Sequence, residues 1–388
     1  MKICAIISEF NPFHNGHKYL VDKASELGYT HKIAIMSGNF VQRGEPAIIS
    51  KGARAQAALK NGINLVIEIP SVWAISTSER YARAGVMIAD SLNCVESLVF
   101  GSESGDLKAL ASFAKVLDDP NFPNCLKKYT ETGVTFAKAR EIAVQEILTN
   151  LDTSLCMQNA NDNLAIEYIK NLNKINSKIT PVSIKRIEGE NIISASKIRN
   201  LIHSDIDFKN YLPKNSEEII HKEIKNKLAP TSTKNAEKMI LYKLKSLSKS
   251  EFKDLPDISE GLENRFIKFI NNLENIEKIL LEIKTKRYTM SRLKRIIMAA
   301  VLDIKNENQK EDVPYIRILG ADEKGIEILK KSKNFALPVI TKYSEAKNLS
   351  TFGYKIFEKE CFCTSIYGLF LESVKNFPPE QQFKLIRG

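Results

Sequence analysis

Two histidines near the start of the chain, His14 and His17, stand three residues apart around Gly16 in the stretch SEFNPFHNGHKYL (residues 8–20). The stretch begins where the apolar run KICAII (2–7) ends, and it leads into a helical pattern. A helix that starts there offers unpaired backbone N–H groups and the positive end of its dipole, which suit a phosphate. Both imidazoles can donate to phosphate oxygens, and a glycine lets a phosphate approach the backbone closely. We therefore expect this corner to stabilise charge on phosphorus during phosphoryl or nucleotidyl transfer, usually with Mg²⁺.

The same pair of histidines is also compatible with two other interpretations. An H-x-x-H spacing also arises by chance on surfaces, or it could form half of a zinc site, although no third ligand follows nearby in the sequence. Most of the cysteines are isolated in apolar settings, and one C-x-C pair without a second is a weak metal signal. We therefore expect reduced core cysteines at Cys4, Cys94, Cys125, Cys156, Cys361 and Cys363.

The elements that must position this corner alternate between apolar strands and helices. We expect strands at 2–7, 31–37, 64–70, 97–103 and 179–187, and helices at 17–27, 51–62, 78–93 and 194–204. Ser50 is a candidate cap for the second helix, which Gly62 would end. This alternation predicts a doubly wound, parallel, Rossmann-like sheet with right-handed crossovers. Ligands of such sheets bind beyond the carboxyl ends of the strands, where the histidine corner lies.

The composition changes near residue 205. We expect a catalytic domain at 1–205 and a mainly helical, basic region at 206–388, because several amphipathic helix patterns follow a Lys-rich connection. From about residue 314 the tail mixes strand-like segments (315–320, 337–342, 351–358 and 359–367) with a helix at 323–332. This mixture predicts a small α/β appendage.

The composition is that of an ordinary soluble protein, with 43% apolar and 27% charged residues among 388. No run approaches about 18 uncharged apolar residues, and the first segment lacks a signal-peptide cleavage site, so we expect a cytoplasmic protein without membrane spans. The net charge of +11 favours a polyanionic partner without identifying one.

The histidine corner resembles the H-x-G-H signature of the nucleotidylyltransferase superfamily, which binds ATP and catalyses attack at its α-phosphate. The superfamily carries a second signature, I-S-S-T-x-I-R, which ISASKIR (193–199) matches at Ser194 and Arg199. Ala195 and Ser196 depart from it, but a hydroxyl is retained at 196, so a phosphate contact can survive.

A narrower resemblance covers nearly the whole chain. The blocks EFNPFHNGH, MSGNFVQRGEPAIISK, VIEIP, FGSESGD and YIRILG are similar to the bacterial tRNA(Met) cytidine acetate ligase family. The resemblance implies activation of acetate by ATP and acetyl transfer to N4 of the wobble cytidine of elongator tRNA(Met). It implies catalytic roles for His14 and His17. It also implies ATP binding by Ile7, Ser8, Glu9, Phe10, Asn11, Pro12, Phe13, His14, Asn15, Gly16, His17, Lys18, Tyr19 and Leu20, together with Gly101, Asn161 (rather than Asn163) and Arg186.

Further polar residues are candidates for phosphate or tRNA contacts: Arg43, which Glu45 could orient, Ser196 and Arg199. Lys51 and Arg54 could face the same site or solvent. The basic segments KNKLAPTSTK (225–234) and KRYTMSRLKR (286–295) are candidate tRNA contacts.

Two alternative functions stay open. One is a nucleotidylyltransferase that acts on a small phosphorylated metabolite, and the other is an RNA-binding protein that only senses ATP. The sequence does not identify metal ligands, the acetate pocket or the oligomeric state.

Overall fold

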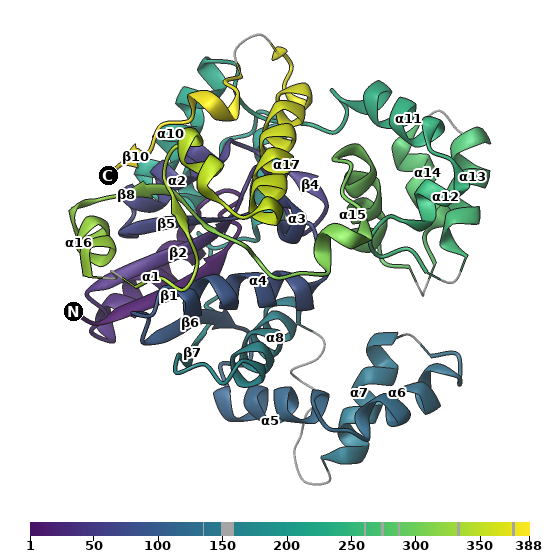
Figure 1. The fold of residues 1–388 in the computed structure, drawn as a ribbon, viewed down its shortest axis with the longest axis horizontal. Coiled ribbons are helices and arrows are strands. Elements are labelled where there is room, and N and C mark those ends of the chain that lie inside the picture. Colours follow the sequence, from purple (N-terminus) through teal and green to yellow (C-terminus); the bar gives the residue numbers. More distant parts are fainter. Residues whose placement is uncertain are drawn as a thin grey trace.

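The computed structural model describes residues 1–134, 136–148, 159–259, 261–272, 275–285, 288–331, 334–374 and 377–388. An eight-stranded sheet at its centre has the order β10-β8-β5-β2-β1-β6-β7, with β9 beside β8 (Figure 1). The strands are Ile3–Ser8 (β1), His31–Ser37 (β2), Leu65–Ile69 (β5), Ser97–Ser102 (β6), Thr180–Lys185 (β7), Ile316–Ala321 (β8), Val339–Ile340 (β9) and Ile386–Arg387 (β10).

The five strands β5-β2-β1-β6-β7 are parallel, as predicted for a doubly wound sheet. Alternate residues of each strand enter two different cores: Ile3 and Ile7 of β1 face one, and Cys4 and Ile6 face the other. The chain runs from β1 outward to β5, then crosses back to β6 on the other side of β1. This reversal lies between β1 and β6, where ligands bind in such sheets.

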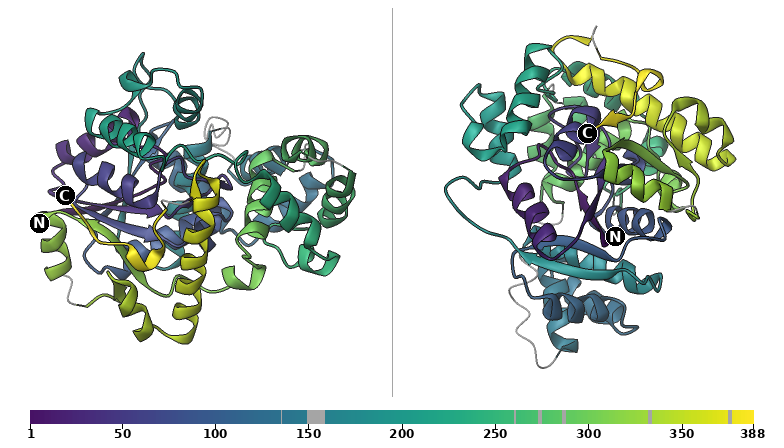
Figure 2. Two further views of the ribbon diagram at one scale, coloured as in Figure 1. Left: turned by 90° about the horizontal axis from the view of Figure 1, so that it is seen from above. Right: turned by 90° about the vertical axis from the view of Figure 1, so that its left-hand side faces the viewer.

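Helices cover both faces of the sheet (Figures 1 and 2). Ser50 caps α2 as predicted, and Ser194 caps α9, because each side chain accepts a backbone N–H of the first turn. The helices are Asn15–Glu26 (α1), Lys51–Lys60 (α2), Ser71–Ala74 (α3), Ser78–Ser91 (α4), Leu107–Leu117 (α5), Phe122–Thr130 (α6), Phe136–Ile147 (α7), Ala160–Lys174 (α8), Ala195–His203 (α9), Lys214–Lys225 (α10), Glu237–Ser246 (α11), Lys249–Lys253 (α12), Leu262–Asn272 (α13), Ile276–Ile283 (α14), Met290–Val301 (α15), Glu323–Lys331 (α16) and Thr351–Tyr367 (α17).

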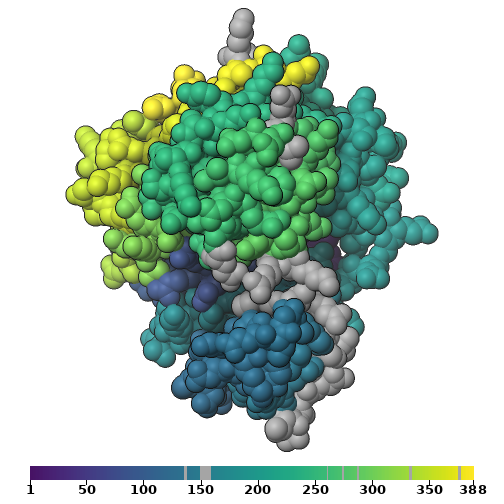
Figure 3. Space-filling view, turned by 90° about the vertical axis from the view of Figure 1, so that its right-hand side faces the viewer, coloured from purple at the N-terminus to yellow at the C-terminus, as the bar shows by residue number. Residues whose placement is uncertain are grey.

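Helices α11 to α15 form a group of their own to one side of the sheet (Figures 1 and 2). Phe252 and Phe266 stack inside it with ring centroids 5.9 Å apart. Figure 3 shows this group in green above the α6–α7 pair in blue. The basic second region is therefore helical where the sequence predicted amphipathic helices.

The tail is α/β, as predicted, but it is not an appendage. Strand β8 pairs antiparallel with β5, and β10 pairs with β8, so the tail extends the main sheet. The ranges 1–205 and 206–388 thus share one sheet.

Segments 351–358 and 359–367, predicted as strands, form the single helix α17. Ser350 caps this helix, and the buried residues Ile356, Cys363 and Tyr367 recur at intervals of two turns and one turn, on one face of the helix. The prediction was wrong because short apolar runs fit either period.

Between β2 and α2 the chain forms a short hairpin, Phe40–Val41 (β3) with Glu45–Pro46 (β4). None of the five described cysteines forms a disulfide, while Cys156 lies outside the described residues. No helix in the described part of the chain combines the length and apolar character that crossing a bilayer requires.

Candidate nucleotide-binding site

His14 and His17 build the start of α1 through their own side chains. Nδ1 of His14 accepts the N–H of Gly16 at 3.0 Å, and Nδ1 of His17 accepts the N–H of His14 at 3.2 Å. This is a reciprocal capping box made by two imidazoles. The two rings lie 3.9 Å apart between centroids, at 30° to one another. The local fold therefore fixes the position and tilt of both rings.

Both imidazoles are neutral at physiological pH. Burial, together with the nearby positive charges of Arg186 and Arg199, lowers the pKa of His14 to about 3. Burial likewise holds the pKa of His17 well below its ordinary value, with His14 and Arg186 acting in the same direction. Because Nδ1 of each ring accepts a backbone N–H, the single proton of each neutral ring lies on Nε2. Each ring therefore keeps one N–H donor for a ligand.

Gly16 has a further role that the sequence did not indicate. A Cβ atom at this position would lie 2.8 Å from Cε1 of His14. The glycine is therefore required by the packing of the histidine ring, in addition to any approach of a phosphate.

A cavity of about 1130 Å³ lies at the carboxyl ends of the strands, and both histidines line it. A smaller recess of about 90 Å³ adjoins it. Ile7, Ser8, Glu9, Phe10 and Asn11 line the cavity, whereas Gly16, Tyr19 and Leu20 line the recess. Of the other residues in the 7–20 stretch, Pro12, Phe13, Asn15 and Lys18 line neither space. Phe13 packs in the core and Lys18 forms an ion pair with Asp22.

Gly101, Asn161 and Arg186 come together at the recess. Gly101 is near the end of β6 and Arg186 follows β7, so adjacent strand ends bring them together. A Cβ at Gly101 would lie 3.4 Å from Cγ of Arg186. Asn161 follows the N-cap Asn159 of α8 and donates to Glu103, whereas Asn163 lines only the larger cavity.

Arg43, Ser196 and Arg199 all line the cavity. Arg199 donates to the carbonyl of Asn11 at 2.9 Å and to Oγ of Ser196 at 3.2 Å. The ion-pair partners of Glu45 are Lys294 and, at 3.8 Å, Arg199. Glu45 therefore connects helix α15 to the ISASKIR segment (193–199). These ion pairs do not include the predicted contact with Arg43.

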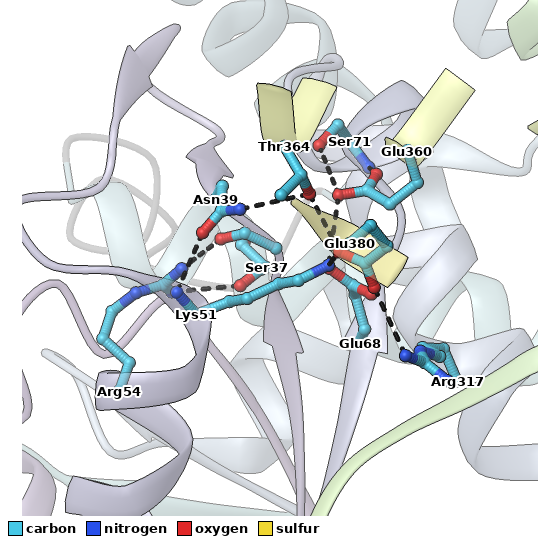
Figure 4. Close-up of polar contacts among 11 residues, drawn as sticks. Ser37, Asn39, Lys51, Arg54, Glu68, Ser71, Arg317, Glu360, Thr364 and Glu380 are labelled. Carbon is cyan, nitrogen blue, oxygen red and sulfur yellow. Dashed lines mark hydrogen bonds and ion pairs between the residues drawn. The ribbon is translucent and has the colours of Figure 1, made fainter. Parts of the chain in front are cut away.

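Lys51 faces neither the cavity nor solvent. Its Nζ lies 2.8 Å from carboxylate oxygens of both Glu68 and Glu380, and 3.8 Å from Glu360 (Figure 4). Burial alone would lower the pKa of Lys51, but the surrounding glutamates raise it above its ordinary value. Glu380, in the C-terminal tail, thus completes a buried ion cluster around Lys51, the first residue of α2.

Arg54 is also buried, and it holds the backbone beneath the histidine corner. Its Nη1 donates to the carbonyls of Glu9 at 2.7 Å and Ser37 at 3.0 Å, and its Nη2 donates to the carbonyl of Gly38. These bonds join the segments that leave β1 and β2, and Figure 4 shows Arg54 beside Ser37 at the end of β2. Arg54 is therefore a positioning residue, not a residue of the cavity wall.

The sequence analysis did not single out several lining residues. Tyr168 lines both spaces, and Thr231, Ser232, Thr233, Met290 and Ser291, which belong to the two segments predicted to contact tRNA, line the cavity. Asn161, Leu164 and Tyr168 share one face of α8 at spacings of three and four residues. That spacing could have revealed Tyr168 once Asn161 was chosen, whereas the others are distant in sequence.

In the described part of the chain, no group of three or more His, Cys, Asp or Glu side chains is arranged to hold a metal ion. The two histidines therefore have no third described ligand for zinc. The geometry supplies donors and positive charge for phosphate oxygens.

Known proteins share this sequence and fold. The HIGH Nucleotidyl Transferase family model matches residues 1–382. The chain is 43% identical to the tRNA(Met) cytidine acetate ligase of Thermoanaerobacter sp. (strain X514) over 95% of each chain. It is 40% identical to the ligase of Caldanaerobacter subterraneus subsp. tengcongensis over 97% of this chain and 96% of the other. The crystal structure of Thermotoga maritima TmcAL bound with alpha-thio ATP matches with a TM-score of 0.94 and 32% identity over all of both chains. With its paired histidines at the reversal point of the sheet, this chain belongs to the tRNA(Met) cytidine acetate ligase family of HIGH nucleotidyl transferases.

Proposed function

We propose that this protein is an ATP-dependent ligase of the cytoplasm. It activates acetate as acetyl-adenylate with release of pyrophosphate, and it transfers the acetyl group to N4 of the wobble cytidine of elongator tRNA(Met). The product is N4-acetylcytidine. The observation that carries the proposal is the closely packed pair of neutral histidines. Their Nε2–H donors lie at a cavity in a chain about 40% identical to such ligases along its length.

In the first step ATP lies across the recess and the cavity, with its triphosphate over the start of α1. An acetate oxygen forms a bond to the α-phosphorus, and the bond to the bridging oxygen breaks, so pyrophosphate leaves with the electron pair. The Nε2–H groups of His14 and His17 stabilise the charge that grows on the phosphoryl oxygens, and the guanidinium of Arg186 adds positive charge. Gly101 and Asn161 contact the nucleoside part.

Mg²⁺ accompanies nucleotides in most reactions of this kind. No group of three or more His, Cys, Asp or Glu side chains among the described residues is arranged to hold a metal ion, and a nucleotide-bound Mg²⁺ takes most of its ligands from phosphate oxygens and water. We assign no step to it.

In the second step N4 of cytidine attacks the acyl carbon, loses one proton, and AMP leaves with the electron pair. The base must be unstacked to reach the cavity, which suits an anticodon loop. Two basic segments support binding of tRNA by the second region (206–388): Thr231, Ser232 and Thr233 come from 225–234, and Met290, Ser291 and Lys294 come from 286–295. Residues 286 and 287 lie outside the described residues.

The proposal is tested by incubating the protein with ATP, labelled acetate and total tRNA, and then identifying the labelled nucleoside. We expect label in N4-acetylcytidine and pyrophosphate release that depends on acetate. His17→Ala should reduce both by about 10²- to 10³-fold, because one preorganised donor is lost. Lys23→Ala, on the exposed side of the same helix, is the matched control and should leave both unchanged.

Two other results would contradict this proposal. Pyrophosphate release that requires a phosphorylated metabolite and leaves tRNA unlabelled would indicate a nucleotidylyltransferase. Binding of ATP and RNA without any release would indicate a sensor.

A further inference from the structure

The hydroxyl of Tyr168 is buried without a partner at the edge of the site. Tyr168 is 3% exposed, and no described residue accepts or donates a hydrogen bond at its hydroxyl. Buried polar groups in native proteins are nearly always hydrogen-bonded, so an unpaired one needs an explanation. Because Tyr168 lines both the cavity and the recess, a ligand in these spaces can supply the missing partner.

Tyr168 shares its place in the site with the residues proposed to bind the phosphates. The cavity and the recess share part of their lining, which we call the passage. The shared residues are Ile7, Ser8, His17, Asn161, Leu164, Tyr168 and Arg186. His17 and Arg186 are the proposed donors to the phosphates, so the proposed function puts the α-phosphate and its attacking group at the same shared lining as Tyr168.

The passage has the chemistry of a small monocarboxylate site. Burial keeps the pKa of Tyr168 well above its ordinary value, so the hydroxyl stays protonated and can donate a hydrogen bond to an anion. Leu164, one turn earlier on α8, and Ile7 provide apolar surface for a methyl group. Arg186 supplies a positive charge on the same passage. A neutral donor, a cation and an apolar wall together match acetate.

We infer that the Tyr168 hydroxyl donates a hydrogen bond to one carboxylate oxygen of acetate, while the other oxygen attacks the α-phosphorus. The methyl group lies against Leu164 and Ile7. No proton moves in this step: the acetate oxygen supplies the pair of the new O–P bond, and pyrophosphate takes the pair of the broken one. This inference rests on the proposed function and assigns its acetate subsite.

The test is Tyr168→Phe, which keeps the ring and removes the hydroxyl. With the full-length protein and saturating ATP, we expect the KM for acetate in pyrophosphate release to rise about tenfold, as loss of one hydrogen bond to an anion implies. The KM for ATP should change less than about twofold. Tyr315→Phe is the matched control, since Tyr315 is also buried with an unpaired hydroxyl but lines neither space. It should change neither constant.

Other outcomes would overturn the inference. A rise in the KM for ATP alone would mean that Tyr168 contacts the nucleotide, and unchanged constants would mean that the hydroxyl has no substrate partner. A second variant, Leu164→Ala, should enlarge the space for the methyl group and raise kcat/KM for propionate relative to acetate. No gain would refute the placement of the methyl group. Wild-type protein without acetate-dependent pyrophosphate release would instead contradict the proposed function.

Discussion

The buried histidine pair predicts a loss of stability in mild acid that His14→Asn should reduce. The pKa of the folded His14 is about 3, mainly because of burial, whereas the ordinary value is 6.5. Between these values the unfolded chain binds a proton that the folded chain does not. The unfolded state therefore gains relative stability as pH falls, and the free energy of unfolding decreases from about pH 6.5 down to about pH 3.

The size of the effect follows from the difference between the two pKa values. At about 1.4 kcal/mol for each pKa unit, the full contribution of His14 is about 5 kcal/mol. Between about pH 7.5 and about pH 5, protonation of the unfolded chain alone removes about 2 kcal/mol of it. Asparagine is a good N-cap, so His14→Asn keeps the start of α1 while removing the titrating ring.

Urea denaturation at both pH values measures the change in the free energy of unfolding. The loss on acidification should be about 2 kcal/mol smaller in His14→Asn than in the wild type. The control is Asn15→Ala in the same turn, which removes bonds to the carbonyls of Asn191 and Asn210 but no titratable group. It should lower stability equally at both pH values. Equal acid losses in wild type and His14→Asn would refute the reasoning.

Three further predictions concern the site, the ion cluster and the proposed RNA partner. Gly16→Ala should lower acetate-dependent pyrophosphate release at least about tenfold, because a Cβ would lie 2.8 Å from the His14 ring and displace it; full activity with an unchanged circular dichroism spectrum would contradict this. Lys51→Met should lower the free energy of unfolding in urea by about 3–5 kcal/mol, since Glu68 and Glu380 would lose the cation between them; an unchanged midpoint would show that the cluster contributes no net stability. Binding of tRNA, measured by filter retention, should weaken steeply between about 50 and about 200 mM salt, whereas a salt-independent affinity would argue against backbone contacts by the basic region.

The sequence alone determined the parts of this protein that depend on neighbouring residues. Strand and helix periods, the caps at Ser50 and Ser194, and the histidine corner are all local, because a cap or an apolar repeat is formed within one or two turns. The five parallel strands followed from the same patterns. The resemblance to ATP-dependent ligases rested on short contiguous blocks of sequence.

Only the tertiary structure decided which distant residues meet. Lys51 faces neither the cavity nor solvent, because Glu380 reaches it from the other end of the chain. The tail strand β8 joins β5 although its sequence would suit an independent unit equally well. The partnerless hydroxyl of Tyr168 is visible only once β1, α8 and the strand ends are assembled. Apolar periodicity fixes which face of an element is buried, but the neighbour that covers the face depends on packing and charge pairing across the whole chain.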